Sequence, residues 1–423
     1  MDTLIKNCRY LDSASGSFCA GSVGIAEGVI THTGSPPSTE PSNTIDASGS
    51  MVIPGLIDCY ARLREPGYEK LATIATETNA AKHSAITTIM CSPDTVPVTD
   101  EPAIVELIKR RAAAAANIRV LPIGAATIGQ QGEQLGELRT LADSGCVAFS
   151  NGDHPITNTQ VMRRLMEYSS GFGLKLIIAP QDPWLSDGVA HEGSVATRLG
   201  LRAIPAAAET VALSQLIELC YQTGADVHFS RLSSQRGVQL VSQAKKDNIK
   251  VTADVGIDHL FLTEMDTSDF NSLCHTSPPF RSRTDLNALR EGIASGVIDA
   301  ICSNHAPHET DSKLTPFPES KPGISSLDSF LGLLIKLADE TSIPLATMIA
   351  RATSGPADCF ALNNGRLDIG KPADLAIINS DEDWEFTVDN MRSQGKNSPY
   401  EGWLFHAYPA TVLVDGKPLD LNH

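Results

Sequence analysis

The sequence contains no long hydrophobic run. Nowhere do about 18 apolar residues follow one another, so we expect no membrane-spanning helix. The N-terminal stretch MDTLIKNCRYLD also lacks the apolar segment of a secretory signal peptide. The net charge of −17 argues against nucleic acid and anionic membranes as partners. Together these absences predict a soluble, cytoplasmic protein.

The usual spacings of metal-binding and disulfide-bonded residues are missing as well. The nine cysteines are scattered and include no C-x-x-C pair, which favours free, mostly buried thiols in a reducing compartment. The 11 histidines include no His-x-His and no His-Glu-x-x-His, two spacings that are typical of zinc sites. We therefore expect no cofactor.

Eight apolar, partly β-branched runs alternate with helix-like stretches in the middle of the chain. Strand followed by helix, eight times over about 250 residues, predicts an α/β fold with a (β/α)8 TIM-like barrel. A doubly wound open sheet is the alternative, but no glycine-rich phosphate fingerprint follows the early strands. The predicted strands are 51–57, 86–91, 118–123, 146–150, 174–179, 226–232, 249–255 and 297–303, and the clearest helices are 101–116, 158–170, 206–223 and 234–247.

Both ends of the chain differ from the middle. They carry short apolar runs separated by turn-forming residues, which is typical of small antiparallel strands. Residues 33–43 (TGSPPSTEPSN) are too rich in proline and serine for either regular element, and residues 414–417 (VDGK) resemble a hairpin turn between strands. We predict one small β-sandwich domain built from residues 1–50 and 363–423, beside a barrel of residues 51–362.

The stretch 52–67 (VIPGLIDCYARLREPG) carries the most specific pattern in the chain. An apolar run leads into charged residues, as in a buried strand that delivers polar side chains to its carboxyl end. This stretch resembles the first barrel strand of the dihydroorotase and hydantoinase branch of the amidohydrolases. Residues 396–399 (KNSP) and 411–416 (TVLVDG) also resemble dihydroorotase motifs, so the resemblance spans nearly the whole chain. In 52–67 the matching residues are Pro54, Gly55, Asp58, Arg64, Glu65, Pro66 and Gly67.

The resemblance implies a barrel whose strand ends hold zinc for the hydrolysis of a cyclic amide. In this sequence no aligned ligand position keeps a metal ligand. Arginine is a fixed cation, alanine donates nothing, and asparagine cannot exchange a proton near neutral pH. Asn304 stands where the family has its aspartate general acid and base. The altered metal positions are Tyr60, Arg62, Asn151, Gly152, Ala179, Arg231 and Asn304.

Positions that contact substrate in the family are partly kept. Arg64 retains the arginine that grips the substrate carboxylate, and His308 is also retained. Asp94 and Ser277 replace two asparagines, and an aspartate repels a carboxylate. Any residual ligand binding is therefore expected at Arg64, Asp94, Ser277 and His308.

The altered metal positions lie at the carboxyl ends of the predicted barrel strands, which form the mouth of the barrel. Their replacement leads to three further expectations. A zinc site made from the remaining His228, His308, Asp153 and Asp254 lacks the usual ligand spacing and is disfavoured. Without divalent cations, carboxylates such as Asp58 need counter-charge, and we expect Arg62 and Arg231 to provide it as ion pairs. The polar loop 309–320, which covers substrate in relatives, is expected either to be mobile or to plug the mouth.

Within the family, the chain resembles the inactive dihydroorotase-like subunits that accompany aspartate carbamoyltransferase in bacteria such as pseudomonads. This resemblance implies a non-catalytic role in pyrimidine biosynthesis, as a homodimer in a larger assembly with the transcarbamoylase catalytic subunit. Two alternatives stay open. One is a weak or metal-independent cyclic-amide hydrolase that uses His308 or Asp153 as base. The other is a binding module that senses a pyrimidine intermediate through Arg64 and His308.

Overall fold

A barrel of parallel strands forms the centre of the molecule. The fold is taken from a computed structural model and described for residues 1–37, 41–115 and 117–421. The ends of the barrel sheet meet through an Arg62 N–H that donates to the His305 carbonyl at 3.0 Å. The predicted (β/α)8 barrel is therefore confirmed. In sheet order its strands are β15 (Ala300–Cys302), β14 (Val251–Gly256), β13 (Val227–Phe229), β10 (Leu176–Ile178), β9 (Ala148–Ser150), β8 (Arg119–Ala125), β7 (Ile86–Cys91) and β6 (Leu56–Ala61).

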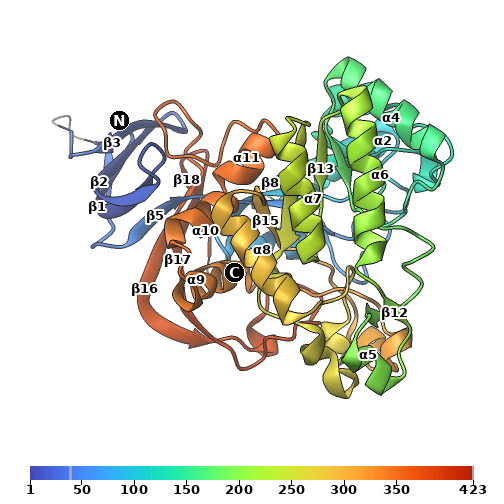
Figure 1. Ribbon diagram of the computed structural model, residues 1–423. Coiled ribbons are helices and arrows are strands. Elements are labelled where there is room, and N and C mark those ends of the chain that lie inside the picture. The colour runs from blue at the N-terminus through green and yellow to red at the C-terminus, as the bar shows by residue number, and fades with distance from the viewer. Residues whose placement is uncertain (38–40, 116, 422–423) are drawn as a thin grey trace.

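Helices surround the barrel and begin close to where the sequence predicts (Figure 1). The side chain of Asn158 accepts hydrogen bonds from the first turn of α4, and that of Ser234 caps α7 in the same way. The predicted helix 101–116 is observed from Pro102, and residue 116 lies outside the described residues. The helices are α1 (Ile74–Lys82), α2 (Pro102–Ala115), α3 (Leu138–Ser144), α4 (Thr159–Phe172), α5 (Ser194–Leu199), α6 (Ala207–Thr223), α7 (Gln235–Lys246), α8 (Arg283–Ser295), α9 (Phe330–Glu340), α10 (Leu345–Arg351) and α11 (Ser354–Cys359).

A second sheet combines strands from both ends of the chain. Figure 1 shows the blue N-terminal strands beside the orange and red C-terminal strands at one flank of the barrel. The hairpin turn is confirmed, since Val414 pairs with Lys417. Part of the predicted loop 33–43, residues 38–40, lies outside the described residues. The strand order is β18 (Lys417–Pro418), β17 (Leu404–Val414), β16 (Leu375–Glu385), β5 (Met51–Pro54), β1 (Thr3–Asp12), β2 (Ser17–Ala26) and β3 (Val29–Gly34), and β4 (Asn43–Asp46) pairs with β1.

The prediction of one continuous strand over residues 51–57 is wrong. Its first half is β5, which pairs with β1 and β16 in the terminal sheet, whereas β6 opens the barrel. Gly55 separates the two strands. A Cβ atom there would lie 2.2 Å from the Thr87 hydroxyl oxygen, so only glycine fits where the chain crosses between the sheets. As a result Tyr60 belongs to the barrel strand itself. The domain boundaries at 50/51 and 362/363 remain a prediction.

Short 3-10 helices and one small strand pair complete the connections. All nine cysteines lie in the described part of the chain and are free, and eight of them are buried, as predicted. Over the same residues, no helix combines the length and hydrophobicity that a bilayer crossing requires. The short elements are η1 (Ile128–Gln130), η2 (Ile257–Leu260), η3 (Glu264–Phe270), η4 (Ser272–Cys274), η5 (Thr310–Lys313), η6 (Phe317–Glu319), η7 (Val388–Asn390), β11 (Ala190–His191) and β12 (Ala203–Ile204).

Candidate functional site at the mouth of the barrel

Two buried guanidinium groups occupy the carboxyl-end mouth of the barrel. Arg62, which follows β6, donates from Nε to Asp94 Oδ2 at 2.8 Å and from Nη2 to Asp153 Oδ2 at 2.5 Å. Arg231, which follows β13, donates from Nη2 to Asp153 Oδ1 at 2.5 Å. The arginine side chains are 8% and 2% exposed. Asp153 therefore bridges the two cations, with one oxygen on each.

Two more of the altered metal positions contact these arginines. The guanidinium carbons of Arg62 and Arg231 lie 5.3 and 4.7 Å from the centre of the Tyr60 ring. The Tyr60 hydroxyl is buried and has no hydrogen-bond partner among the described residues. Asn304 Oδ1 accepts a bond of 3.4 Å from Arg231 Nη1. The structure thus brings Tyr60, Arg62, Arg231 and Asn304 into one group.

The remaining altered positions lie on the neighbouring strand ends. Asn151 donates from Nδ2 to the Gln130 and His154 carbonyls, and its Oδ1 accepts from the Thr127 hydroxyl at 2.7 Å. These bonds use the amide to hold loop backbone in place. Ala179 follows β10 and lines a cavity together with Asn151. Neither side chain offers an ionised oxygen or an imidazole to a metal ion.

The charges of Arg62, Arg231, Asp94 and Asp153 compensate each other. Burial alone would raise the pKa of Asp153, but Arg231 and Arg62 hold it well below its usual range. Burial likewise opposes ionisation of Asp94, yet Arg62 and the hydrogen bond from Ser92 lower its pKa. Both carboxylates are therefore ionised at neutral pH, and two positive charges face two negative ones.

The predicted ligand-binding residues do not form a single group. Arg64 donates from Nε to the Pro307 carbonyl at 3.2 Å, and its Nη2 lies 3.3 Å from His308 Nε2. Burial, followed by the charge of Arg64, lowers the pKa of His308 to about 3, so this imidazole is neutral at physiological pH. Asp94 is bound to Arg62, and Ser277 lines a different cavity beside Arg231.

Two small cavities lie beside these residues. One cavity of about 30 Å³ is lined by Asn151, Gly152 and Ala179, and another of about 20 Å³ by Ala179, Arg231 and Ser277. Because a water molecule needs roughly 10–15 Å³ of such space, these cavities are of the size of one or two waters.

The loop 309–320 is packed beside the mouth. Lys313 is buried and donates to the carbonyls of Ser272 and His275 at 3.1 and 3.2 Å. Phe317 is buried and stacks on the His275 ring, with ring centres 4.8 Å apart. The loop, which contains η5 and η6, therefore folds against η4.

Comparison with known proteins identifies the family. The model of the family described as "Dihydro-orotase-like" matches residues 49–237. Over 421 residues the chain is 42% identical to a "Dihydroorotase-like protein" of Pseudomonas aeruginosa. This match covers 98% of this chain and 99% of that protein. The chain belongs to the dihydroorotase-like family. It is also 36% identical over 418 residues to a dihydroorotase of Syntrophotalea carbinolica, covering 99% of this chain and 98% of that protein.

Solved structures of hydantoinases have the same architecture as this chain. An L-hydantoinase from Arthrobacter aurescens superimposes with a TM-score of 0.89 at 21% sequence identity, covering 99% of this chain and 95% of that one. A D-hydantoinase from Thermus sp. gives a TM-score of 0.85 at 20% identity, covering 98% and 94%. The barrel and the accompanying β-sandwich are thus a hydantoinase-like fold.

The zinc that dihydroorotase ancestry implies does not fit this mouth. Two of the positions where the sequence resemblance predicts ligands are arginines, and a guanidinium group has five donors and no lone pair for a metal. Both guanidinium groups are already paired with Asp153 at the place where the strand ends converge. The other aligned positions supply a phenol, two amides, a glycine and an alanine. This donor set gives no basis for a metal-dependent step at the mouth.

The expected pairing of Arg62 and Arg231 with Asp58 is wrong. Asp58 lies inside the barrel wall, where it accepts from the backbone N–H and the hydroxyl of Ser303 and from the Tyr60 N–H. The arginines bind Asp94 and Asp153 instead, because their side chains extend over the mouth. Burial raises the pKa of Asp58 to about 6, although the bonds from Ser303 oppose this shift.

This raised pKa predicts a pH-dependent stability. The folded state holds the Asp58 proton more tightly than the unfolded chain, where the pKa is about 3.8. Protonated Asp58 therefore contributes its full stabilisation of the fold below about pH 3.8, and this stabilisation is lost as the pH rises through about 6. Relative to Asp58→Asn, we expect the wild-type free energy of unfolding to fall by about 2–3 kcal/mol between about pH 4 and pH 7. Urea denaturation of both proteins measures this, and parallel pH profiles would refute it.

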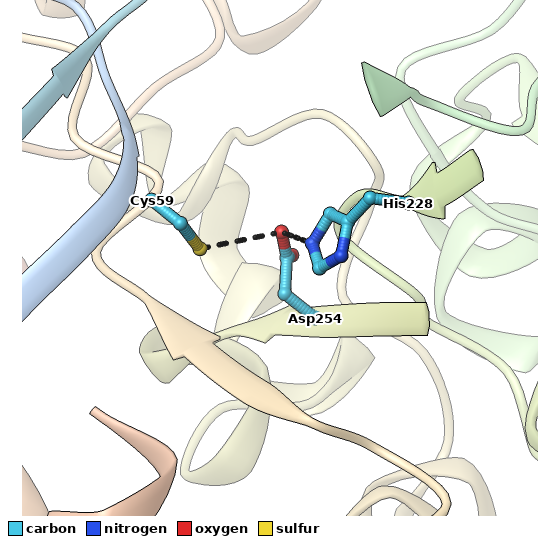
Figure 2. A group of neighbouring side chains, drawn as sticks. All are labelled: Cys59, His228 and Asp254. Carbon is cyan, nitrogen blue, oxygen red and sulfur yellow. Dashed lines mark hydrogen bonds and ion pairs between the residues drawn. The ribbon is translucent and has the colours of Figure 1, made fainter. Parts of the chain in front are cut away.

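The four residues considered from the sequence as a possible zinc site do not come together in the structure. His228 and Asp254 do meet, with 2.9 Å between Nε2 and Oδ2, but Asp153 is bound to the arginines and His308 lies beside Arg64. Sequence reasoning missed Cys59, whose Sγ lies 3.7 Å from the same Asp254 oxygen (Figure 2). The one sequence feature that could have pointed to Cys59 was its position within the 52–67 motif.

Proposed function

We propose that this chain is a catalytically inactive dihydroorotase homologue and a structural subunit of an aspartate carbamoyltransferase assembly in de novo pyrimidine biosynthesis. The observation that carries the proposal is the Arg62–Asp153–Arg231 bridge across the mouth. Hydrolysis of a cyclic amide needs an activated water and a proton carrier. The arginines offer neither, and Asn304 at the general-base position has no titratable proton.

Several motif residues that this chain retains support a scaffold role, because their contacts are structural. His305 binds buried Glu77 at 2.7 Å, and Asp58 binds Ser303. Asn397 of the C-terminal motif donates to the carbonyls of Ala306 and Gly323 at 3.0 Å. A fold that is kept while its reactive positions are replaced is expected to act through its surface. The transcarbamoylase partner and the homodimer come from the resemblance of the sequence.

A mixing experiment tests the partner. We expect the purified chain and the aspartate carbamoyltransferase catalytic chain of the same organism to sediment together, as a species larger than either alone. A hydantoinase of the same fold is the matched control and should sediment separately from the transcarbamoylase. Independent sedimentation of this chain at micromolar concentration would contradict the assembly role.

The hydrolase alternative has little support from its two candidate bases. A general base works best when its pKa lies near the operating pH. The pKa of Asp153 is held far below that by two arginines, and the pKa of His308 is lowered to about 3 by burial and by Arg64. Proton abstraction by either group at neutral pH is therefore inefficient.

The binding-module alternative rests on Arg64, which has no carboxylate partner among the described residues. An anionic ligand would have to replace its contacts with His308 and the Pro307 carbonyl. Thermal-shift measurements with dihydroorotate and carbamoyl aspartate distinguish the two roles. A scaffold gives no shift, and a saturable rise in melting temperature would favour the sensor.

A further inference from the structure

Three potential metal ligands meet inside the barrel. Cys59 comes from β6, His228 from β13 and Asp254 from β14, and Figure 2 shows the thiol and the imidazole on either side of the carboxylate. His228 Nε2 lies 2.9 Å and Cys59 Sγ 3.7 Å from Asp254 Oδ2. The three donor atoms all lie within 4.8 Å of one another, and each residue is at most 1% exposed.

A fourth donor lies next to this group. Cys302, at the end of β15, places its Sγ 3.3 Å from Asp254 Oδ1 and is fully buried. The thiols of Cys59 and Cys302 also hydrogen-bond to each other. Cys59 and His228 thus contact one oxygen of Asp254 and Cys302 contacts the other, so Cys302 has to move toward the first three donors to share an ion with them.

We propose that Cys59, His228, Asp254 and Cys302 form a buried structural site for one Zn²⁺ ion. Zinc in structural sites is tetrahedral, with sulfur, nitrogen and oxygen ligands at about 2.0–2.3 Å, which places neighbouring ligands roughly 3.3–3.7 Å apart. The Cys59–Asp254 separation of 3.7 Å already has this value. The His228–Asp254 separation of 2.9 Å has to open by only a few tenths of an ångström.

The surroundings orient the two central ligands. Thr252 Oγ1 lies 2.8 Å from His228 Nδ1, so the imidazole can present Nε2 to the ion while Nδ1 donates to this hydroxyl. The backbone N–H of Arg231 donates to Asp254 Oδ1 at 2.6 Å. Such outer contacts fix ligand geometry in metal sites.

Charge and protons balance for this site. Without metal, His228 and Asp254 share one proton and Cys59 keeps its thiol proton, so the three groups carry no net charge. Zn²⁺ displaces both protons to solvent, and the three ligands with the ion are again neutral. Cys302 completes the tetrahedron as a thiolate with release of a third proton, which leaves one negative charge on the site.

This site is separate from the altered mouth. It uses Cys59, Asp254 and Cys302, none of which occupies a metal position implied by the resemblance, and it does not depend on the proposed function. All four ligands are at most 1% exposed, so a bound ion has no position open to substrate. Its expected role is to hold β6, β13, β14 and β15 together.

Metal analysis of the full chain tests the site. We expect about one zinc per chain after unfolding and refolding with Zn²⁺, with a higher melting temperature than the chain refolded with chelator. Cys59→Ala should hold at least about tenfold less zinc, whereas Cys91→Ala should hold as much as the wild type. Cys91 is the matched control because it is also 1% exposed, in the adjacent strand β7, and bonds the Ser92 carbonyl.

The wild type alone also decides the proposal if Cys59→Ala does not fold. Refolding with Co²⁺ should give the near-ultraviolet thiolate-to-cobalt charge-transfer band of a cysteine-ligated ion. A wild type that holds no zinc and shows no such band would overturn the site. Equal zinc loss in Cys59→Ala and Cys91→Ala would overturn it too.

Discussion

Glu77→Ala is expected to lower the free energy of unfolding by about 3–5 kcal/mol, because it removes a buried carboxylate that accepts several hydrogen bonds at once. Glu77 lies in α1 and is 0% exposed. Its carboxylate accepts from His305 Nε2 at 2.7 Å, from the Ser393 hydroxyl at 2.7 Å and from the Gln394 N–H at 3.0 Å. Alanine at position 77 leaves the buried His305 imidazole without its acceptor and removes a partner of the buried Ser393 hydroxyl.

Urea denaturation followed by far-ultraviolet circular dichroism measures this loss. Glu106→Ala is the matched control, since Glu106 lies in the neighbouring helix α2, is 63% exposed at its side chain and pairs with Lys109 of its own helix. We expect the control to change stability by at most about 0.5 kcal/mol. A loss below about 1 kcal/mol for Glu77→Ala would show that this network adds little.

The Glu77 network also explains why the motif around His305 persists in this chain. It joins α1, the segment after β15 and residues 393–394 of the C-terminal segment. These contacts position the strand ends whether or not the mouth binds metal. His305 therefore has a structural role in this network.

Arg62→Ala is expected to lower the free energy of unfolding by about 2–4 kcal/mol. The change leaves Asp94 without its ion pair and removes one of the two cations on Asp153. Breaking a fully buried pair costs about 3–5 kcal/mol, and solvent lowers this cost because the carboxylates are 21% and 39% exposed. No catalytic activity should change, since none is proposed for this mouth.

A double variant separates the lost ion pair from other effects of the truncation. Arg62→Ala/Asp94→Ala should be less destabilised than the sum of the two single variants, because the unpaired carboxylate is then absent. Arg139→Ala is the surface control, since its pair with Asp143 is 55% and 60% exposed. An unchanged melting temperature for Arg62→Ala would contradict the view that the arginines hold the mouth together.

Local periodicity made most of the fold predictable. The strand 86–91 is observed as β7, and α4, α6 and α7 begin within one residue of their predicted starts. These elements are specified by residues within themselves, such as the apolar spacing and the caps. The break at Gly55 was not predictable in this way, because it depends on contact with Thr87, which lies far along the chain.

For the candidate site, the order of the motifs along the sequence predicted which residues lie at the strand ends, but not which residues they contact. The sequence placed Tyr60, Arg62, Arg231 and Asn304 at strand ends, and the structure brings them together. It did not predict which carboxylates the arginines bind. That choice depends on the direction of each side chain at the barrel mouth, as does the meeting of Cys59 with His228 and Asp254 in the interior.

Dihydroorotate turnover tests the central claim most directly, namely that the mouth carries no catalytic metal. Hydrolysis of dihydroorotate and cyclisation of carbamoyl aspartate are measured on the purified chain, with and without added zinc, beside a dihydroorotase as positive control. The same assay on Cys59→Ala separates any contribution of the interior site. We predict rates equal to buffer for the wild-type chain and for Cys59→Ala, including samples that hold zinc, while the dihydroorotase control turns over. Zinc-dependent turnover above buffer by the wild-type chain would contradict the account.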